Sequence, residues 1–181
     1  MKKKENRKIR ITKMVFQDSL IELLKTRPIL DITVKDICEL ADMSRSTFYA
    51  HFKDQYDLLR QIEKNTLEYF EGMLNQYQNN VNKKEISQML EEMLSYIANN
   101  SNSIQVLLSE NGDIDFQKKI FQHFTNNKQV IKYFSEKQKD NEVYYSVFLV
   151  HGAIGLVQHW LKNNASIPAP QLAKMLIKWT E

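Results

Sequence analysis

The segment between residues 33 and 52 constrains the fold most, because two helix signals stand there with only a short turn between them. An apolar stripe with the spacing i, i+3, i+4, i+7 is formed by Val34, Ile37, Cys38 and Ala41. Thr33 stands at the capping position before this stripe, and Asp36 stands three residues later, where it completes a capping box. The pattern predicts a short helix over 34–41 that ends at a turn around Asp42.

The second helix signal has one apolar face and one polar face. Ser44 stands at its capping position, and Phe48 and Phe52 fall on the same side at about 100° per residue. The opposite side carries small, aromatic and cationic side chains, contributed by Ser46, Tyr49, Ala50 and Lys53. Because this side has no carboxylate before Asp54, we expect a helix over 45–52 that can approach an anionic surface closely.

The remainder of the chain predicts further helices. Four Gly and three Pro among 181 residues leave few obligatory turns, which favours an all-α protein. Apolar spacing predicts a first helix over 9–26 that Pro28 closes, and Asp54 caps a fourth helix that runs to residue 78. Further segments follow, with helices expected over 85–99, 102–110 and 116–134 and a looser stretch over 135–141.

The C-terminal part combines a very apolar run with an amphipathic helix. Residues 143–161 read VYYSVFLVHGAIGLVQHWL and are apolar nearly all the way round a helix. A membrane span is the alternative, but two histidines and a glutamine interrupt the run, and a bilayer needs about 20 predominantly apolar residues. The helix over 168–180 sets an apolar stripe on one side, formed by Leu172, Met175, Leu176 and Trp179. We expect both helices to be covered partly by a second copy of the chain, with no membrane involved.

Charge is spread unevenly along the chain. The net charge is only +3, but residues 1–60 carry 13 Lys and Arg against 9 Asp and Glu, and residues 61–181 carry 12 against 13. The first 13 residues alone hold seven cations and one Glu. This asymmetry indicates nucleic-acid contact by the N-terminal end, although a solvated basic tail that aids solubility is an equal alternative for the tail alone.

Cysteine and histidine usage argues against several other classes. The single cysteine, Cys38, excludes an intrachain disulfide, and no Cys and His cluster has the spacing of a zinc site. No apolar segment follows the basic start, as it would in a secretory signal, so we expect a cytoplasmic protein without cofactor or metal. The sequence has no Gly-rich phosphate loop, no HExxH and no nucleophile elbow, so we expect no enzymatic activity.

The run ITVKDICELADMSRSTFYAHFKDQYDLL, residues 32–59, resembles the DNA-binding domain of the TetR (tetracycline repressor) family of bacterial regulators. The family pattern is met at buried and exposed positions alike, by Thr33, Val34, Ile37, Ala41, Ser44, Thr47, Phe48, Tyr49, His51, Phe52 and Leu58. Two positions depart from it, since Asp42 replaces the usual Gly and Gln55 replaces a frequent Lys. The resemblance implies a three-helix helix-turn-helix domain over 1–54, joined to a larger helical domain for effector binding and dimerisation over 55–181.

The resemblance also implies which residues meet double-stranded DNA. It implies that the helix 45–52 enters the major groove and that contacts come from Thr33, Lys35, Ser44, Arg45, Ser46, Thr47, Tyr49, His51 and Lys53. Arg45 is the candidate for contacting a base, because a guanidinium can bond O6 and N7 of guanine together. Lys53, Tyr49 and His51 are the candidates for phosphate contacts. The alternatives are that Tyr49 and His51 only cover the small domain's core and that Arg45 is a solvated charge.

Members of this family commonly bind a small molecule between the middle helices and the second-last one. The candidate contacts are aromatic side chains, namely Phe116, Phe124, Tyr144, Phe148 and His151, although aromatic stripes at helical spacing more often serve packing. We therefore predict a ligand-responsive dimeric repressor that binds a palindromic operator. The alternative is a TetR-like protein-binding coregulator without a small-molecule effector, which would combine a pocket too small for any ligand with an exposed apolar patch on 85–141.

Overall fold

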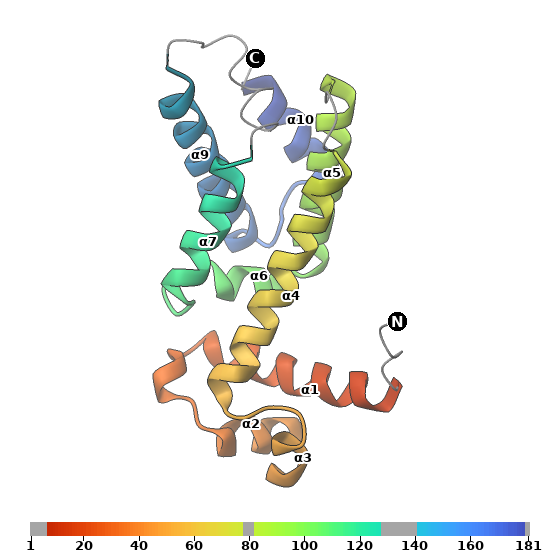
Figure 1. Cartoon of the computed structure of the whole chain (residues 1–181), viewed down its shortest axis with the longest axis vertical. Coiled ribbons are helices and arrows are strands. Elements are labelled where there is room, and N and C mark those ends of the chain that lie inside the picture. Colours follow the sequence, from red (N-terminus) through yellow and green to blue (C-terminus); the bar gives the residue numbers. More distant parts are fainter. Residues whose placement is uncertain (1–6, 78–81, 128–140, 180–181) are drawn as a thin grey trace.

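The computed structural model describes residues 7–77, 82–127 and 141–179, and these ranges are α-helical apart from one 3₁₀ turn and the connecting loops (Figure 1). The elements are α1 (Arg7–Leu24), η1 (Ile29–Asp31), α2 (Val34–Ala41), α3 (Arg45–Tyr49), α4 (Gln55–Gln76), α5 (Lys83–Asn99), α6 (Ser101–Leu107), α7 (Ile114–Thr125), α9 (Glu142–Lys162) and α10 (Ala169–Trp179). No strand occurs within the described ranges. The predicted all-α fold is confirmed.

The first three helices pack around an aromatic centre. Phe16 of α1 is fully buried, and its ring meets those of Phe48 and Phe52 edge-on, with centroid distances of 5.2 Å and 6.2 Å. This burial explains why the two phenylalanines share one face of the third helix segment. In Figure 1, α2 and α3 lie at the end of the molecule opposite α9 and α10, and α4 runs from one part toward the other. The predicted domain boundary, between residues 54 and 55, falls where α4 begins.

Short-range backbone chemistry sets the helix ends in this region. Asp42 has φ 50° and ψ 44°, so it adopts the left-handed conformation, and its N–H donates to the carbonyl oxygens of Cys38 and Glu39. The turn therefore forms as predicted without a glycine. The third helix is shorter than the predicted 45–52, because the N–H groups of His51 and Phe52 both donate to the Phe48 carbonyl and close the chain into a turn.

The C-terminal helices form the part of the molecule opposite α2 and α3 (Figure 1), in which α10 packs along α5 and both α6 and α7 contact α9. Asn82 and Glu85 form a capping box that starts α5 two residues earlier than predicted. The predicted helix over 116–134 instead begins at Ile114, after the cap Asp113, and ends at Thr125. Its predicted continuation beyond 127, and most of the predicted loose stretch over 135–141, lie outside the described residues.

Candidate nucleic-acid interface and ligand cavity

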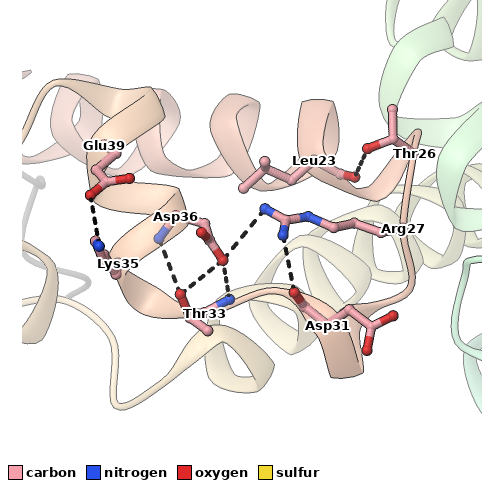
Figure 2. Close-up of polar contacts among 8 residues, drawn as sticks. All are labelled: Leu23, Thr26, Arg27, Asp31, Thr33, Lys35, Asp36 and Glu39. Atoms are coloured by element: carbon pink, nitrogen blue, oxygen red, sulfur yellow. Dashed lines mark hydrogen bonds and ion pairs between the residues drawn. The ribbon is translucent and has the colours of Figure 1, made fainter.

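The start of α2 is held by a cluster of hydrogen bonds and an ion pair, which Figure 2 shows. The Thr33 backbone N–H and its hydroxyl both donate to Oδ2 of Asp36, at 2.8 Å each. The Asp36 N–H donates back to Oγ1 of Thr33 at 3.2 Å. Both predicted members of the capping box are therefore engaged, and the first turn of α2 has one defined orientation.

Arg27 ties this cap to the end of α1. Its Nη2 lies 3.4 Å from Oδ2 of Asp36, and its Nη1 donates to the Asp31 carbonyl at 3.2 Å (Figure 2). The backbone and hydroxyl hydrogen bonds from Thr33, followed by the charge of Arg27, lower the pKa of Asp36. Because the carboxylate form is the one being stabilised, the cap keeps its charge and its geometry around neutral pH.

After the turn that follows α2, α3 begins with a second helix cap, at Ser44. Oγ of Ser44 accepts from the Thr47 N–H at 3.1 Å and lies 2.7 Å from Oγ of Ser46 and 2.9 Å from Oγ1 of Thr47. Cys38 is buried beneath the turn, and burial raises the pKa of its thiol. Three neighbouring hydroxyl groups thus stand at the start of α3, on the side away from Phe48.

The side chains predicted to meet DNA gather at the outer side of α2 and α3. Arg45, Ser46 and Lys53 are exposed, and the Tyr49 ring is 57% exposed although its edge contacts Phe48 at a centroid distance of 5.7 Å. His51 is half-buried against Phe52. More than half of the Tyr49 ring is therefore exposed to solvent, whereas His51 covers the small core in part.

Two further predicted contacts flank this face. Thr33 and Lys35 are exposed at the start of α2, but the Thr33 hydroxyl is already engaged in the cap, and Nζ of Lys35 lies 3.6 Å from a carboxylate oxygen of Glu39. Such an exposed pair contributes little to stability, so Lys35 can exchange its partner at low cost. The basic residues 1–6 lie outside the described part of the chain.

A cavity of about 150 Å³ lies in the C-terminal part, enclosed by side chains from α4, α5, α6, α7, α9 and α10. Among the described lining residues the only polar one is Thr66, whose hydroxyl donates to the Ile62 carbonyl at 3.0 Å. Phe116 and Phe124 line the cavity, as predicted for ligand contacts. Helix α5 also contributes to the lining and was not among the predicted contacts, although its apolar stripe would have indicated it: Met89, Leu90, Met93, Leu94 and Ile97.

The other three predicted ligand contacts do not face this cavity. Tyr144 and Phe148 are 79% and 70% exposed on the outer side of α9. The His151 ring contacts that of Phe121 on α7 at a centroid distance of 3.8 Å and an interplanar angle of 56°, beside a shallow surface groove. These residues are corrected from cavity contacts to surface positions, because the helix turns them away from the side on which Val150 and Val157 are buried.

The outer side of α9 is largely apolar and carries little side-chain bulk at its two glycines. Its exposed apolar members are Val143, Tyr144, Val147, Phe148, Gly152 and Gly155, and the exposed His151 lies among them. A Cβ added to either glycine would meet nothing within 4 Å. On α10, by contrast, Leu172 is 1% exposed, Leu176 lines the cavity, and only Trp179 of the predicted stripe is strongly exposed. The apolar stripe of α10 therefore packs mainly within its own chain.

One buried acid lies between the two parts of the molecule and has no counterpart in the sequence predictions. Glu63 of α4 is 7% exposed, and its Oε1 has no hydrogen-bond partner among the described residues. Burial, and then the charge of Asp113 at the start of α7, raise its pKa from 4.5 to about 7, against the opposing charges of Lys119 and Arg60. Glu63 is thus poised to change its charge near neutral pH.

The described ranges contain neither a metal-binding cluster nor a membrane-spanning helix. They hold no group of three or more His, Cys, Asp or Glu side chains arranged to bind a metal ion. None of their helices, α9 included, has the length and apolar content needed to cross a bilayer.

Two capped helices joined by a tight turn, with a polar outer face on the second, define a helix-turn-helix module attached to an α-helical domain with an apolar cavity. The family model of bacterial regulatory proteins of the tetR family matches residues 18–62, and a transcriptional regulator C-terminal region model matches residues 84–181. The chain belongs to the tetR family of transcriptional regulators. Its N-terminal part is the DNA-binding domain of that family.

Individual relatives agree with this assignment. The HTH-type transcriptional regulator YxbF of Bacillus subtilis (strain 168) is 22% identical over 155 residues, which span 83% of this chain and 40% of that relative's length. A TetR transcriptional regulator from Streptococcus agalactiae 2603V has 24% identity and a TM-score of 0.65, over 97% of this chain and 96% of that one. The regulator FadR of Bacillus subtilis, in complex with stearoyl-CoA, has 16% identity and a TM-score of 0.65, over 92% and 96%. At these identities the two structures are similar to this chain in fold alone.

Proposed function

We propose that this regulator is a ligand-responsive, homodimeric repressor that binds a palindromic operator through α3. The observation that carries the proposal is the outer face of α3, where a cation, hydroxyl groups and an exposed aromatic ring stand on a helix that is capped at Ser44 and anchored from behind by Phe48. A rigid, polar and cation-bearing helix is what the major groove admits. A dimer on the operator would exclude the polymerase and so repress transcription.

Individual side chains are proposed to have different roles on DNA. Arg45 contacts a base edge, and its guanidinium forms no ion pair within the described part of the chain, unlike those of Arg27 and Arg60. Contacts to the phosphates come from Thr33, Lys35, Tyr49, His51 and Lys53, while Ser44, Ser46 and Thr47 offer hydroxyl groups at the start of the helix.

The test is a DNA selection from genomic fragments, followed by binding assays on the selected operator. The log of affinity is expected to fall linearly with the log of salt concentration, by about 0.9 for each phosphate contacted. Arg45→Ala is expected to cost about 1–3 kcal/mol and to relax preference at one base pair, whereas Lys53→Ala should weaken all sequences alike and reduce the salt slope by about one. A flat salt response, or two variants that bind like the wild type, would contradict the proposal.

Dimerisation is proposed to occur through the outer side of α9. An apolar surface rimmed by polar residues is typical of a protein interface, and Gly152 and Gly155 leave room for a second backbone. The contribution of α10 is restricted to its exposed end at Trp179. Two copies related by a two-fold axis would present two α3 helices to the two halves of a palindrome.

Release from DNA is proposed to start at the cavity and to reach the DNA-binding domain through the turn after α6. Leu107 and Leu108 form part of the cavity wall, and the Leu108 carbonyl accepts from Nε2 of Gln158 on α9 at 2.8 Å. From the same turn, Nδ2 of Asn111 donates to the Leu24 carbonyl at the end of α1, at 3.1 Å. A ligand that displaces this wall would therefore move α1, against which α3 packs.

The coregulator alternative has less support. Its two requirements were a pocket too small for any ligand and an exposed apolar patch on residues 85–141. The described residues of this segment contribute Ile114 as their strongly exposed large apolar side chain, and they line a cavity of about 150 Å³. The ligand-responsive proposal is therefore preferred.

A further inference from the structure

We infer that the cavity takes an uncharged hydrocarbon of roughly six to eight carbon atoms, or a group of that kind on a larger molecule, and rejects charged ligands. This inference rests on the proposed ligand-responsive function and names the chemical class of the ligand. It follows from the lining, the volume and the absence of a counter-ion.

The lining determines the polarity of the ligand. Apart from Thr66, every lining side chain in the described ranges is apolar, and the wall includes Phe70, Met93, Leu107 and Phe116 from four different helices. The Thr66 hydroxyl donates to a carbonyl of its own helix, so its donor is already used. A ligand with buried polar groups would leave them without partners, which strongly disfavours its binding.

The volume determines the size of the ligand. Apolar cavities of about 150 Å³ remain free of water and accept benzene-sized molecules. Each methyl or methylene group that fits should tighten binding about fourfold, and groups beyond the capacity of the cavity should give no further gain. Met89 and Met93 lie in the wall, and their flexible thioethers can adjust to slightly different ligand shapes.

The charges around α4 determine which ligands are excluded. None of the described lining side chains carries a charge. Glu63, one turn before Thr66 on the buried side of α4, is an acid without a hydrogen-bond partner for its Oε1 among the described residues, and it is not one of the residues that line the cavity. The described lining therefore offers no counter-ion to a buried ion of either sign.

The experiment compares probes of equal size and different charge on the full-length protein. Benzene, toluene, benzoate and benzylammonium are titrated calorimetrically and in thermal unfolding, without DNA. We expect toluene to bind about fourfold more tightly than benzene and to raise Tm, and both ions to bind at least about 100-fold more weakly than toluene. Toluene added to the complex of the protein with the selected operator is also expected to release the protein from the DNA.

A variant that fills the cavity tests the location. Ala153→Phe places a ring from α9 into the cavity, and Gln105→Phe on the exposed side of α6 is its matched control. Ala153→Phe is expected to lose toluene binding at least about tenfold and to keep operator affinity, while the control behaves like the wild type. Val157→Phe, also from α9, replaces it if Ala153→Phe does not fold.

The outcomes separate this inference from the proposed function. Ions that bind as well as toluene, a wild type that does not bind toluene, or a filled cavity that still binds it would each overturn the inference. A protein that selects no DNA but binds toluene in the Ala153-dependent manner would refute the proposed function and leave the hydrocarbon site intact. An operator that is bound normally by a protein without any toluene affinity would refute only the hydrocarbon site.

Discussion

Replacing Glu63 with Gln is expected to stabilise the protein above neutral pH and to change little in mild acid. The carboxyl group is 7% exposed, and its pKa rises from 4.5 in the unfolded chain to about 7 in the folded protein. Glutamine has nearly the same shape and no charge at any pH. The variant therefore removes the cost of the buried charge while keeping the packing.

The direction in which stability changes with pH follows from the number of protons that the folded and unfolded states bind. Between pH 4.5 and about 7 the folded state binds more protons at Glu63 than the unfolded state, so rising pH lowers the free energy of unfolding. The contribution is complete below 4.5 and is lost by the time the pH has passed about 7. At about 1.4 kcal/mol for each pH unit between these values, the upper limit of the loss is about 3 kcal/mol.

The assay is urea unfolding followed by circular dichroism, at one protein concentration because dimerisation adds to apparent stability. The difference between Glu63→Gln and the wild type is expected to grow from near zero at about pH 4.5 to about 1–3 kcal/mol at about pH 8. Glu68→Gln, an exposed position on the same helix, is the control and is expected to change stability by less than about 0.5 kcal/mol. A Glu63→Gln difference that is constant with pH would refute the reasoning.

Three further predictions concern the caps, the dimer and the link between the two parts. Thr33→Val is expected to lower the free energy of unfolding in urea by about 1 kcal/mol and to reduce the loss of stability in acid. The reason is that the lowered pKa of Asp36 contributes stability that is lost as the pH falls through its folded-state pKa. If the variant loses as much stability in acid as the wild type, the result argues against the capping box. Gly155→Glu is expected to convert the dimer to a monomer in sedimentation experiments and to abolish tight binding to a palindromic operator. Leu176 is unsuitable for the same test because it lines the cavity. A Gly155→Glu variant that still sediments as a dimer would place the interface elsewhere. Asn111→Ala removes the hydrogen bond to the Leu24 carbonyl and is expected to lower the free energy of unfolding by about 1 kcal/mol. It should also weaken ligand-induced release from DNA without changing the ligand affinity measured by calorimetry. Full release by the variant would exclude the Asn111–Leu24 contact as the route from the cavity to the DNA-binding domain.

Much of the DNA-binding part could be predicted because its signals act over three or four residues. The capping box at Thr33, the cap at Ser44 and the turn at Asp42 depend on contacts between near neighbours, and the Phe48 and Phe52 positions follow from helical geometry alone. Such contacts are the same whatever the rest of the chain does. Helix ends were less accurate, as at α3 and α7, because hydrogen bonds in the last turn compete with the helix pattern.

The cavity and the directions of the C-terminal helices depended on tertiary packing. A helix that is apolar all the way round, such as α9, does not indicate from its sequence which side meets its own chain, so Tyr144 and Phe148 were expected in the cavity and lie on the surface. The volume of the cavity is what remains when six helices pack, and no local pattern encodes it.

Glu63 shows most clearly which properties depend on the sequence alone and which depend on tertiary packing. In the sequence it is one of many acids on a helix, with apolar and polar neighbours on either side. Only tertiary packing removes the carboxyl group from water and brings Asp113, at the start of α7, close enough to raise its pKa further. The sequence by itself determined the helices, their caps and the DNA-binding motif, since these depend on neighbours along the chain. The tertiary structure decided burial, charge state and cavity shape, since these depend on groups that are distant in sequence.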